Sequence, residues 1–425
     1  MTADHVLYGP NGVVVSSDGA GLQSQRLPLV LAVTTLVQTL VSMAITLPTI
    51  MAPVVAPQLG VGPESVGFLM LLAGVASMLS SPFSGGLLHR VGAFRLNQLS
   101  VLLLATALLL AASGNVYLVL LFALTLGFCQ TTSISSAAYM LARVTPAHRI
   151  SVVLSVRQSG MPIGAALTGL LVPALLLVFD WRALCALLAA LLGLSLLAER
   201  PLRPLIEGTH LPHAGGSAAS MPALMRSLWV HPALRALTIC GFAYTFAQTA
   251  LLVFMVSYLH LELGFGLAAA GGVFALSQGA AMVSRLFWGW TADRLREPLQ
   301  LLAWLGTASA ALCVVAGSFA PAWPAWLVSL TVILMGATLT GWNSVYSGGV
   351  VRYSPHGAEG AMTGAVNFYG FMGNLLGPPV GALLVLFTRH YSVIFFACAL
   401  AIIPVAWMCG VVGRGLVAKG IHVTR

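Results

Sequence analysis

The chain has 425 residues, of which 59% are hydrophobic and only 7% are charged, whereas a soluble globular domain carries about 25% charged residues. So little charge cannot cover a water-facing surface, and the sequence therefore excludes a soluble fold and predicts an integral membrane protein. The net charge of +9 does not indicate nucleic-acid binding, because a single lysine, Lys419, accompanies scattered arginines that form no basic patch.

The chain begins with a polar segment that is rich in Gly and Ser. It lacks the basic start and the short apolar core of a signal peptide, so residues 1–25 are predicted to form a flexible cytosolic tail. Twelve apolar runs follow, and a bilayer-spanning helix needs about 20 such residues. The runs lie near residues 27–47, 65–88, 96–113, 116–142, 150–178, 182–198, 233–259, 267–291, 298–318, 323–350, 361–387 and 392–413.

The one long polar connection divides the spans six and six, near residues 199–232. Fifteen of the 19 Lys and Arg residues fall on the side of the N-terminus, and only Arg182 and Arg389 fall on the other side. The positive-inside rule then places both termini in the cytosol, for a multi-pass protein of the inner or plasma membrane. The predicted parts are an N-terminal six-helix bundle (26–200), a cytosolic linker (201–230), a C-terminal six-helix bundle (231–415) and a cytosolic tail (416–425).

The two halves of the chain repeat one another. The span at 116–142 ends in Arg143-Val-Thr-Pro, and the span at 323–350 ends in Arg352-Tyr-Ser-Pro, 209 positions later. A duplicated six-helix unit is typical of transporters, whose substrate sites form where two repeats face each other near the midplane. Further pairs keep the same or the next offset: Gly127 with Gly336, Ser135 with Ser344, Gly160 with Gly370, and Trp181 with Tyr391.

Two loops and two helices carry a family signature. The loop after the second span reads GGLLHRVG from Gly85, and its counterpart after the eighth span reads GWTADR from Gly289. The fifth span is rich in Gly and Pro, and GFMGNLLGPPVG in the eleventh span echoes it. Small residues let helix backbones approach closely in lipid, and Pro bends a helix.

With these features the chain resembles the major facilitator superfamily over residues 26–415. The resemblance implies an all-α fold of twelve transmembrane helices in two pseudo-symmetric six-helix bundles. It also implies a secondary transporter that works by alternating access, with a lipid bilayer and a small-molecule substrate as its partners. No cofactor or nucleic acid is implied.

In this family the loop motif G-x-L-x-D-R-x-G-[RK] helps to latch the two halves in one state. Here His89 stands where the motif has its acid, while Asp293 keeps the acid in the second half. A carboxylate favours a helix N-terminus by roughly 0.3–1 kcal/mol, which a neutral His89 cannot do, so the first latch is expected to be weak; the alternative is that His89 is only a solvated loop residue. The residues expected in the latch are Gly85, His89, Arg90, Gly92, Asp293, Arg294, Arg143 and Arg352.

Two arginines, Arg157 and Arg285, lie inside predicted spans, where a charge costs about 2.5–3.5 kcal/mol on insertion scales. All ten acids fall in a predicted tail, a loop or a helix end, so neither arginine has an obvious partner in the membrane. The planar guanidinium fork suits a carboxylate, and the resemblance places the fifth and eighth helices next to each other across the cavity. The sequence therefore favours a small organic anion as substrate, while snorkelling of the side chains to cytosolic water remains the alternative.

Other polar residues in the spans are candidates for the same site. Gln158 follows Arg157, and Asn367 is its repeat counterpart, 210 positions later. The resemblance implies that the first, fourth, seventh and tenth helices line the cavity, which adds Gln38, Gln248 and Asn343. Each of these is about as well explained by a hydrogen bond to a neighbouring helix.

The sequence contains no enzyme constellation, such as a P-loop or a nucleophile elbow, and no cysteine pair that indicates a metal site or a disulfide. The six cysteines are expected to be small buried residues. For coupling, the sequence leaves open a proton, an exchanged anion or the charge of the substrate itself, with a carboxylate at a span end such as Glu262 or Glu359 as one carrier. Two alternatives stay open: efflux of neutral or cationic lipophilic compounds, and a non-transporting membrane sensor or assembly partner.

Overall fold

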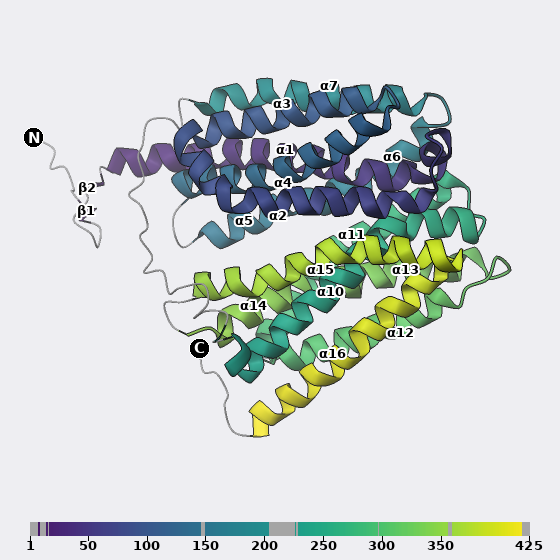
Figure 1. The fold of residues 1–425 in the computed structure, drawn as a ribbon. Coiled ribbons are helices and arrows are strands. Elements are labelled where there is room, and N and C mark those ends of the chain that lie inside the picture. Colours follow the sequence, from purple (N-terminus) through teal and green to yellow (C-terminus); the bar gives the residue numbers. More distant parts are fainter. Residues whose placement is uncertain are drawn as a thin grey trace, which may run out of the picture.

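Helices account for nearly all of the chain in the computed structural model, which describes residues 7–8, 14–15, 17–145, 149–203, 226, 228–295, 297–355 and 359–418. Twelve segments of this part are long and apolar enough to cross a membrane, which confirms the predicted number of spans and the all-α fold. Figure 1 shows two helical bundles, one above the other.

The first bundle holds the elements up to residue 202. Within it α3 packs against α4 and α7, while α4 also packs against α2, and α1 against α6. Its elements are α1 (Ser17–Gln58), the short η1 (Pro63–Ser65), α2 (Val66–Val91), α3 (Ala93–Ala111), α4 (Val116–Val144), α5 (Ile150–Gln158), α6 (Gly160–Leu175), α7 (Trp181–Glu199) and η3 (Arg200–Leu202).

The second bundle repeats this arrangement, with α10 packed against α15 and α16, and α12 against α16. Two of its spans contain a π-helical turn, η4 and η5. Its elements are α10 (Pro232–Ser257), η4 (Tyr258–Glu262), α11 (Leu267–Leu295), α12 (Pro298–Gly317), α13 (Ala325–Met335), η5 (Gly336–Thr340), α14 (Asn343–Tyr353), α15 (Glu359–Thr388) and α16 (Ser392–Ala418).

The predicted flexible tail is only partly irregular. Residues 17–25 belong to α1, which is 42 residues long, and ahead of it β1 (Leu7–Tyr8) pairs with the antiparallel β2 (Val14–Val15). At the other end α16 continues to Ala418, past the predicted start of the C-terminal tail. Most of the predicted linker, residues 204–225, lies outside the described residues, as do residues 419–425.

The predicted fifth span is divided into α5 and α6 by a turn at Ser159. Pro162 causes the break because it has no N–H to donate to the carbonyl of Gln158 four residues earlier. The predicted tenth span is likewise divided, by η5 and a turn at Gly341 and Trp342. Both interruptions lie in spans of the polar site described below.

The sequence repeat is visible in the helix contacts. A Cβ added at Gly127 would overlap the backbone carbonyl of Ala73, and one at Gly336 would overlap that of Ser277. Ala73 and Ser277 belong to α2 and α11, the second span of each bundle. The fourth span therefore packs on the second span through a glycine in both bundles.

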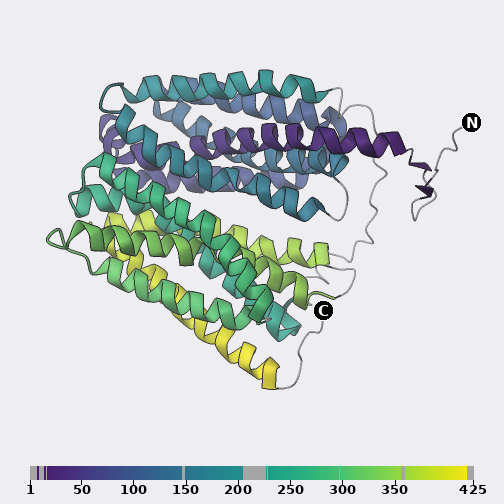
Figure 2. The same cartoon turned by 180° about the vertical axis from the view of Figure 1, so that it is seen from behind.

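The two bundles meet at one end of the molecule. We call the end at which α1 begins and α16 finishes the terminal end, and the opposite one the far end. The bundles lie closest at the far end and diverge toward the terminal end (Figures 1 and 2). Gly67 at the start of α2 packs against the carbonyl of Pro378 in α15, and Gly271 at the start of α11 packs against the carbonyl of Gly169 in α6.

Candidate functional site

Arg157 lies inside the first bundle, where its side chain is only 2% exposed. Its Nη2 atom donates to Gln38 Oε1 on α1, at 2.8 Å, and to the backbone carbonyl of Ser133 on α4, at 3.3 Å. The guanidinium is therefore held between three helices by neutral acceptors. It does not snorkel to solvent.

Glycines bring α1 close enough for this contact. A Cβ at Gly160 would lie 2.9 Å from the carbonyl oxygen of Thr35 and 3.2 Å from the Cβ of Gln38. A Cβ at Gly164, one turn later, would overlap the carbonyl of Thr39. The two glycines therefore let α6 lie directly on α1, and Arg157, in the preceding turn, comes within reach of Gln38.

Several polar atoms around this arginine are buried and have no hydrogen-bond partner in the described part of the chain. They are Nε of Arg157, Nε2 of Gln38 and Oγ of Ser133. An unsatisfied buried polar group costs about 1–3 kcal/mol. Two of the three atoms can only donate, so a ligand with acceptor oxygens would satisfy them.

Arg285 lies on α11 in the second bundle and is half-buried. Its Nε is buried without a partner, and no hydrogen bond or ion pair joins it to any described residue. Arg157 lies 12 residues before Gly169, and Arg285 lies 14 residues after Gly271. Since these two glycines touch, the arginines are about 18 and 21 Å from the same contact and lie at a similar depth on neighbouring helices.

The second bundle repeats the glutamine but gives it a different donor. Gln248, 210 positions after Gln38, accepts a hydrogen bond from the indole Nε1 of Trp342 at 2.9 Å. Trp342 lies 209 positions after Ser133. The same glutamine carbonyl is thus bound by a cation in one bundle and by a neutral indole in the other.

The remaining predicted substrate residues are more dispersed. Asn343 is half-buried, and its Nδ2 lies 3.5 Å from the carbonyl of Thr340. Gln158 and Asn367 are exposed, and the structure does not bring either of them into contact with Arg157 or Gln38. Gln278 lines a small cavity of about 20 Å³ together with Gln248.

A larger cavity of about 270 Å³ lies at the far end of the first bundle. Its walls come from α1, α2, α3, α4 and α7 and are almost wholly apolar. Met51, Val55, Phe68, Leu108, Phe122 and Trp181 are among the residues that line it.

The predicted latch loop of the first bundle is reduced to one residue. Gly92 alone separates α2 from α3, and its φ of 87° lies in the left-handed region that favours glycine. Gly85 is part of α2, Arg90 and Asp293 are exposed, and the side chain of His89 lies outside the described residues. The effect of His89 on the latch stays a prediction.

Three of the four arginines of the latch set have aromatic neighbours. Arg294 lies over the ring of Trp290, 5.5 Å from its centroid. Arg143 lies over Tyr139 and donates to its hydroxyl at 2.5 Å. Arg352 is half-buried and is followed directly by Tyr353, which is also half-buried.

The sequence did not predict a buried acid, and the structure contains one. Glu199, the last residue of α7, is 2% exposed and accepts a hydrogen bond of 2.5 Å from Asn97 Nδ2 on α3. The sequence placed Glu199 at a helix end, which is correct, and burial of that end by α3 made the difference. The signal in the sequence was the polar Asn97, which lies beside Gln98 and Ser100 at the start of its span.

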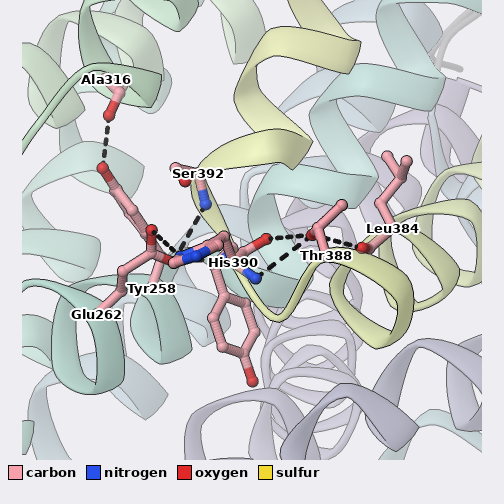
Figure 3. Close-up of polar contacts among 8 residues, drawn as sticks. Tyr258, Glu262, Ala316, Leu384, Thr388, His390 and Ser392 are labelled. Atoms are coloured by element: carbon pink, nitrogen blue, oxygen red, sulfur yellow. Dashed lines mark hydrogen bonds and ion pairs between the residues drawn. The ribbon is translucent and has the colours of Figure 1, made fainter.

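Glu262, one of the predicted coupling carboxylates, has a structural contact (Figure 3). Its Oε2 accepts hydrogen bonds from the backbone N–H groups of Tyr391, at 2.5 Å, and Ser392, at 3.2 Å. His390 Nδ1 lies 3.7 Å from Oε1. Glu262 therefore holds the start of α16 against the end of η4, and the side chain of Glu359 lies outside the described residues.

Comparison with known proteins completes this picture. The family model described as Major Facilitator Superfamily matches residues 34–378, and no curated protein matches the sequence. A bacterial homolog to the human lysosomal transporter Spinster, in an inward-facing and unoccupied conformation, is similar in structure. Its TM-score is 0.74 at 12% identity, and the match covers 92% of this chain and 98% of that one.

Two further solved structures are similar to the chain. A mutant of the nucleoside transporter NupG has a TM-score of 0.72 at 16% identity, covering 91% of this chain and 99% of that one. The inward-facing, occupied form of the bacterial Spinster homolog has a TM-score of 0.67 at 11% identity, covering 93% and 95%. At these identities the likeness concerns the fold alone.

Proposed function

Because the chain belongs to the major facilitator superfamily, we propose that it is a secondary transporter that moves a small organic anion, a carboxylate in particular, by alternating access. The observation that carries this proposal is the pair Arg157 and Arg285. Both lie in membrane spans, and no described acid forms an ion pair with either of them. A positive charge in a site of low dielectric needs a negative partner, and an anionic substrate supplies it.

The polar atoms around Arg157 support an anion in this place. Arg157 Nε and Gln38 Nε2 are donors without acceptors, and a carboxylate has two oxygens that accept. Arg285 lies at a similar depth on the facing bundle, so a bound anion is proposed to draw the two arginines toward each other. Gln158, Gln248, Asn343 and Asn367 remain in the proposed substrate site as polar residues of the fifth, seventh, tenth and eleventh spans.

The arrangement of the bundles supports one state of the transport cycle. The first bundle meets the second at the far end through Gly67 and Gly271. The distribution of arginines predicts that the terminal end is cytosolic. We therefore assign the structure to the inward-facing state, with Asp293 and Arg294 of the latch set separated from the first bundle.

Uptake into proteoliposomes tests the anion proposal. Arg157→Ala and Arg285→Ala are each expected to lower the initial rate for an anionic substrate roughly tenfold or more, because a charged hydrogen bond is worth about 1.5–3 kcal/mol. Arg182→Ala is the matched control, since Arg182 is an exposed far-end arginine that pairs with Asp180. Uptake by both variants at the rate of the control would overturn the proposal.

A second candidate, efflux of neutral or cationic lipophilic compounds, is favoured by two observations. Arg157 already has two neutral acceptors inside its bundle, and the 270 Å³ cavity offers an almost wholly apolar wall. A thermal-shift screen of the purified protein against carboxylates and lipophilic cations separates the two, because a ligand stabilises the state that it binds. Stabilisation by lipophilic cations alone would replace the anion proposal with this one.

A further inference from the structure

The buried pair of Glu199 and Asn97 has one hydrogen-bond donor too few for its polar atoms. Asn97 Nδ2 donates to Glu199 Oε1 at 2.5 Å. The other two polar atoms of the pair, Glu199 Oε2 and Asn97 Oδ1, are buried and have no partner in the described part of the chain. Both are oxygens, and two acceptors cannot bond to each other unless one of them carries a proton.

A carboxylate carries no donor, whereas a carboxylic acid carries one O–H. A proton on Oε2 would give Glu199 a donor for the unpaired Asn97 Oδ1, while Glu199 Oε1 accepts from Asn97 Nδ2. An unpaired carboxylate buried to 2% exposure is costly, and no described arginine forms an ion pair with this one. We propose that Glu199 is a proton-binding site, occupied in this conformation, whose proton is coupled to transport of the anion.

Buried polar residues of α3 and α4 lie between Glu199 and the arginine of the proposed substrate site. Ser100, one turn after Asn97 on α3, shares a hydrogen bond of 2.7 Å with Thr132 on α4. The next residue, Ser133, accepts from Arg157 through its carbonyl. The row, which we call the polar row, consists of Glu199, Asn97, Ser100, Thr132, Ser133, Arg157 and Gln38, none of them more than 2% exposed.

The polar row indicates whether proton binding and anion binding strengthen or weaken each other. This step rests on the proposed function. Inside a protein, charges interact more strongly than in water. We expect the positive charge of Arg157 to favour an ionised Glu199 through the polar row, and a bound anion to cancel that charge, so that anion binding strengthens proton binding. By reciprocity proton binding strengthens anion binding, and proton and anion travel in the same direction.

Among the described groups around Glu199, we expect Glu199 itself to bind and release the proton. Asn97 faces it from α3, and the Cys129 thiol of α4 lies close enough to interact with it electrostatically. The described side chains of α1, which packs against α7, include no charged residue. The nearby arginines Arg95, Arg200 and Arg203 are exposed.

Glu199→Gln is the discriminating variant because its amide forms the same pair without a titrating proton. The glutamine N–H donates to Asn97 Oδ1, and its carbonyl accepts from Asn97 Nδ2, so thermal unfolding is expected to match the wild type. Asp180→Asn is the matched control, an exposed acid that pairs with Arg182. Both variants and the wild type are compared as full chains in lipid.

The first measurement titrates the proton itself by infrared difference spectroscopy between low and high pH. A buried carboxylic-acid carbonyl band that converts to carboxylate as the pH rises is expected in the wild type and in Asp180→Asn, and its loss is expected in Glu199→Gln. Identical difference spectra for the wild type and Glu199→Gln would overturn the proton site. This measurement needs no substrate, so it decides the site even if no anion is transported.

The second measurement compares two modes of transport of a radiolabelled monocarboxylate that stabilises the protein in the thermal-shift screen. Glu199→Gln is expected to lose accumulation driven by a proton gradient while anion exchange at equal pH persists. Accumulation by Glu199→Gln equal to the wild type would overturn the coupling. Failure of the wild type to move any carboxylate would instead overturn the proposed function.

Discussion

Glu262 illustrates what a single charged residue does at the edge of this fold. It ends η4, and its carboxylate caps the first turn of α16 through the N–H groups of Tyr391 and Ser392. The same junction in the first bundle uses Gln58, the last residue of α1, which accepts from the indole of Trp181 at 2.9 Å. In both bundles, therefore, the end of the first span anchors the start of the sixth.

Removal of this cap is expected to destabilise the second bundle. Glu262→Ala leaves the backbone donors of Tyr391 and Ser392, at the start of α16, without this acceptor, and loss of an N-terminal cap costs about 0.5–2 kcal/mol. Thermal unfolding in detergent is expected to show a lower midpoint for Glu262→Ala and a smaller change for Glu262→Gln, whose amide oxygen still accepts. Asp180→Ala is the control, because Asp180 precedes α7 but its side chain makes no capping bond; an equal loss in both variants would contradict the capping role.

For single residues, the sequence identified an unusual charge more readily than the side chains and helices that surround it. Arg157 stood out because no acid lies at its depth, and the structure gives it neutral partners, Gln38 and Ser133. Glu199 did not stand out, because its burial depends on the way α3 covers the end of α7. Sequence position alone cannot distinguish a buried helix end from an exposed one.

At the scale of helices, small residues decide which faces touch. In a membrane the helices gain little from apolar burial against each other, so close packing of backbones carries much of their association. Gly160 and Gly164 provide such a face on α6, against α1, and Gly373 and Gly377 provide one on α15, against the carbonyls of Phe242 and Phe246 in α10. Glycine spacing predicted these faces correctly but not their partner carbonyls.

The α1–α6 contact can be tested through the position of Arg157. Gly164→Leu is expected to lower stability by about 1–3 kcal/mol, the usual cost of overpacking, because its side chain overlaps the carbonyl of Thr39 and the side chain of Ser42. It is also expected to weaken anion binding, since a displaced α6 would move the adjoining α5, and with it Arg157, away from Gln38. Thermal unfolding and ligand-induced thermal shift measure the two effects.

Gly193→Leu is the control for that variant, because Gly193 also lies in a helix but has no atom within 4 Å of a Cβ placed there. A leucine is the better helix former by several tenths of a kcal/mol. The control is therefore expected to keep its stability and its ligand response. A Gly164→Leu protein with normal unfolding would show that α6 does not depend on this close contact.

Helix breaks were harder to predict than helices. Pro162 indicated a bend in the fifth span, but the division into α5 and α6 depends on the loss of one hydrogen bond to Gln158. The π turn at Gly336–Thr340 has no proline. It coincides with the packing of Gly336 on Ser277, which is a tertiary contact and leaves no local pattern.

For the whole molecule, duplication was the strongest predictor. Repeated residues such as Gly127 and Gly336 indicated two six-helix units, and these two glycines make equivalent contacts in the structure. The way in which the units meet was not predictable from the repeat, because a transporter of this kind adopts more than one arrangement. In this one, Gly67 and Gly271, each near the start of the second span of its bundle, form the far-end seam.

The far-end seam predicts how a substitution within it changes the balance between conformations that are closed and open at the far end. A leucine at Gly271 would overlap the carbonyl of Gly169 and the ring of Pro173, so Gly271→Leu is expected to disfavour closure of the far end. The expected result is a longer distance between spin labels at Leu177 and Phe387, one in each bundle, and a shorter one between labels at Arg90 and Arg294 at the terminal end. Because all six native cysteines are buried, they are expected to label little.

Gly272→Leu is the matched control on the adjacent residue, since a Cβ at Gly272 has no atom within 4 Å. If Gly271 acts only through the contact between the bundles, Gly272→Leu is expected to keep both label distances. Gly271→Leu is then expected to change them in opposite directions. A change of the same size in both variants would mean that α11 is disturbed as a helix rather than displaced from α6. Opposite changes in Gly271→Leu alone would establish that this one glycine contact holds the far end closed, as the proposed alternating access requires.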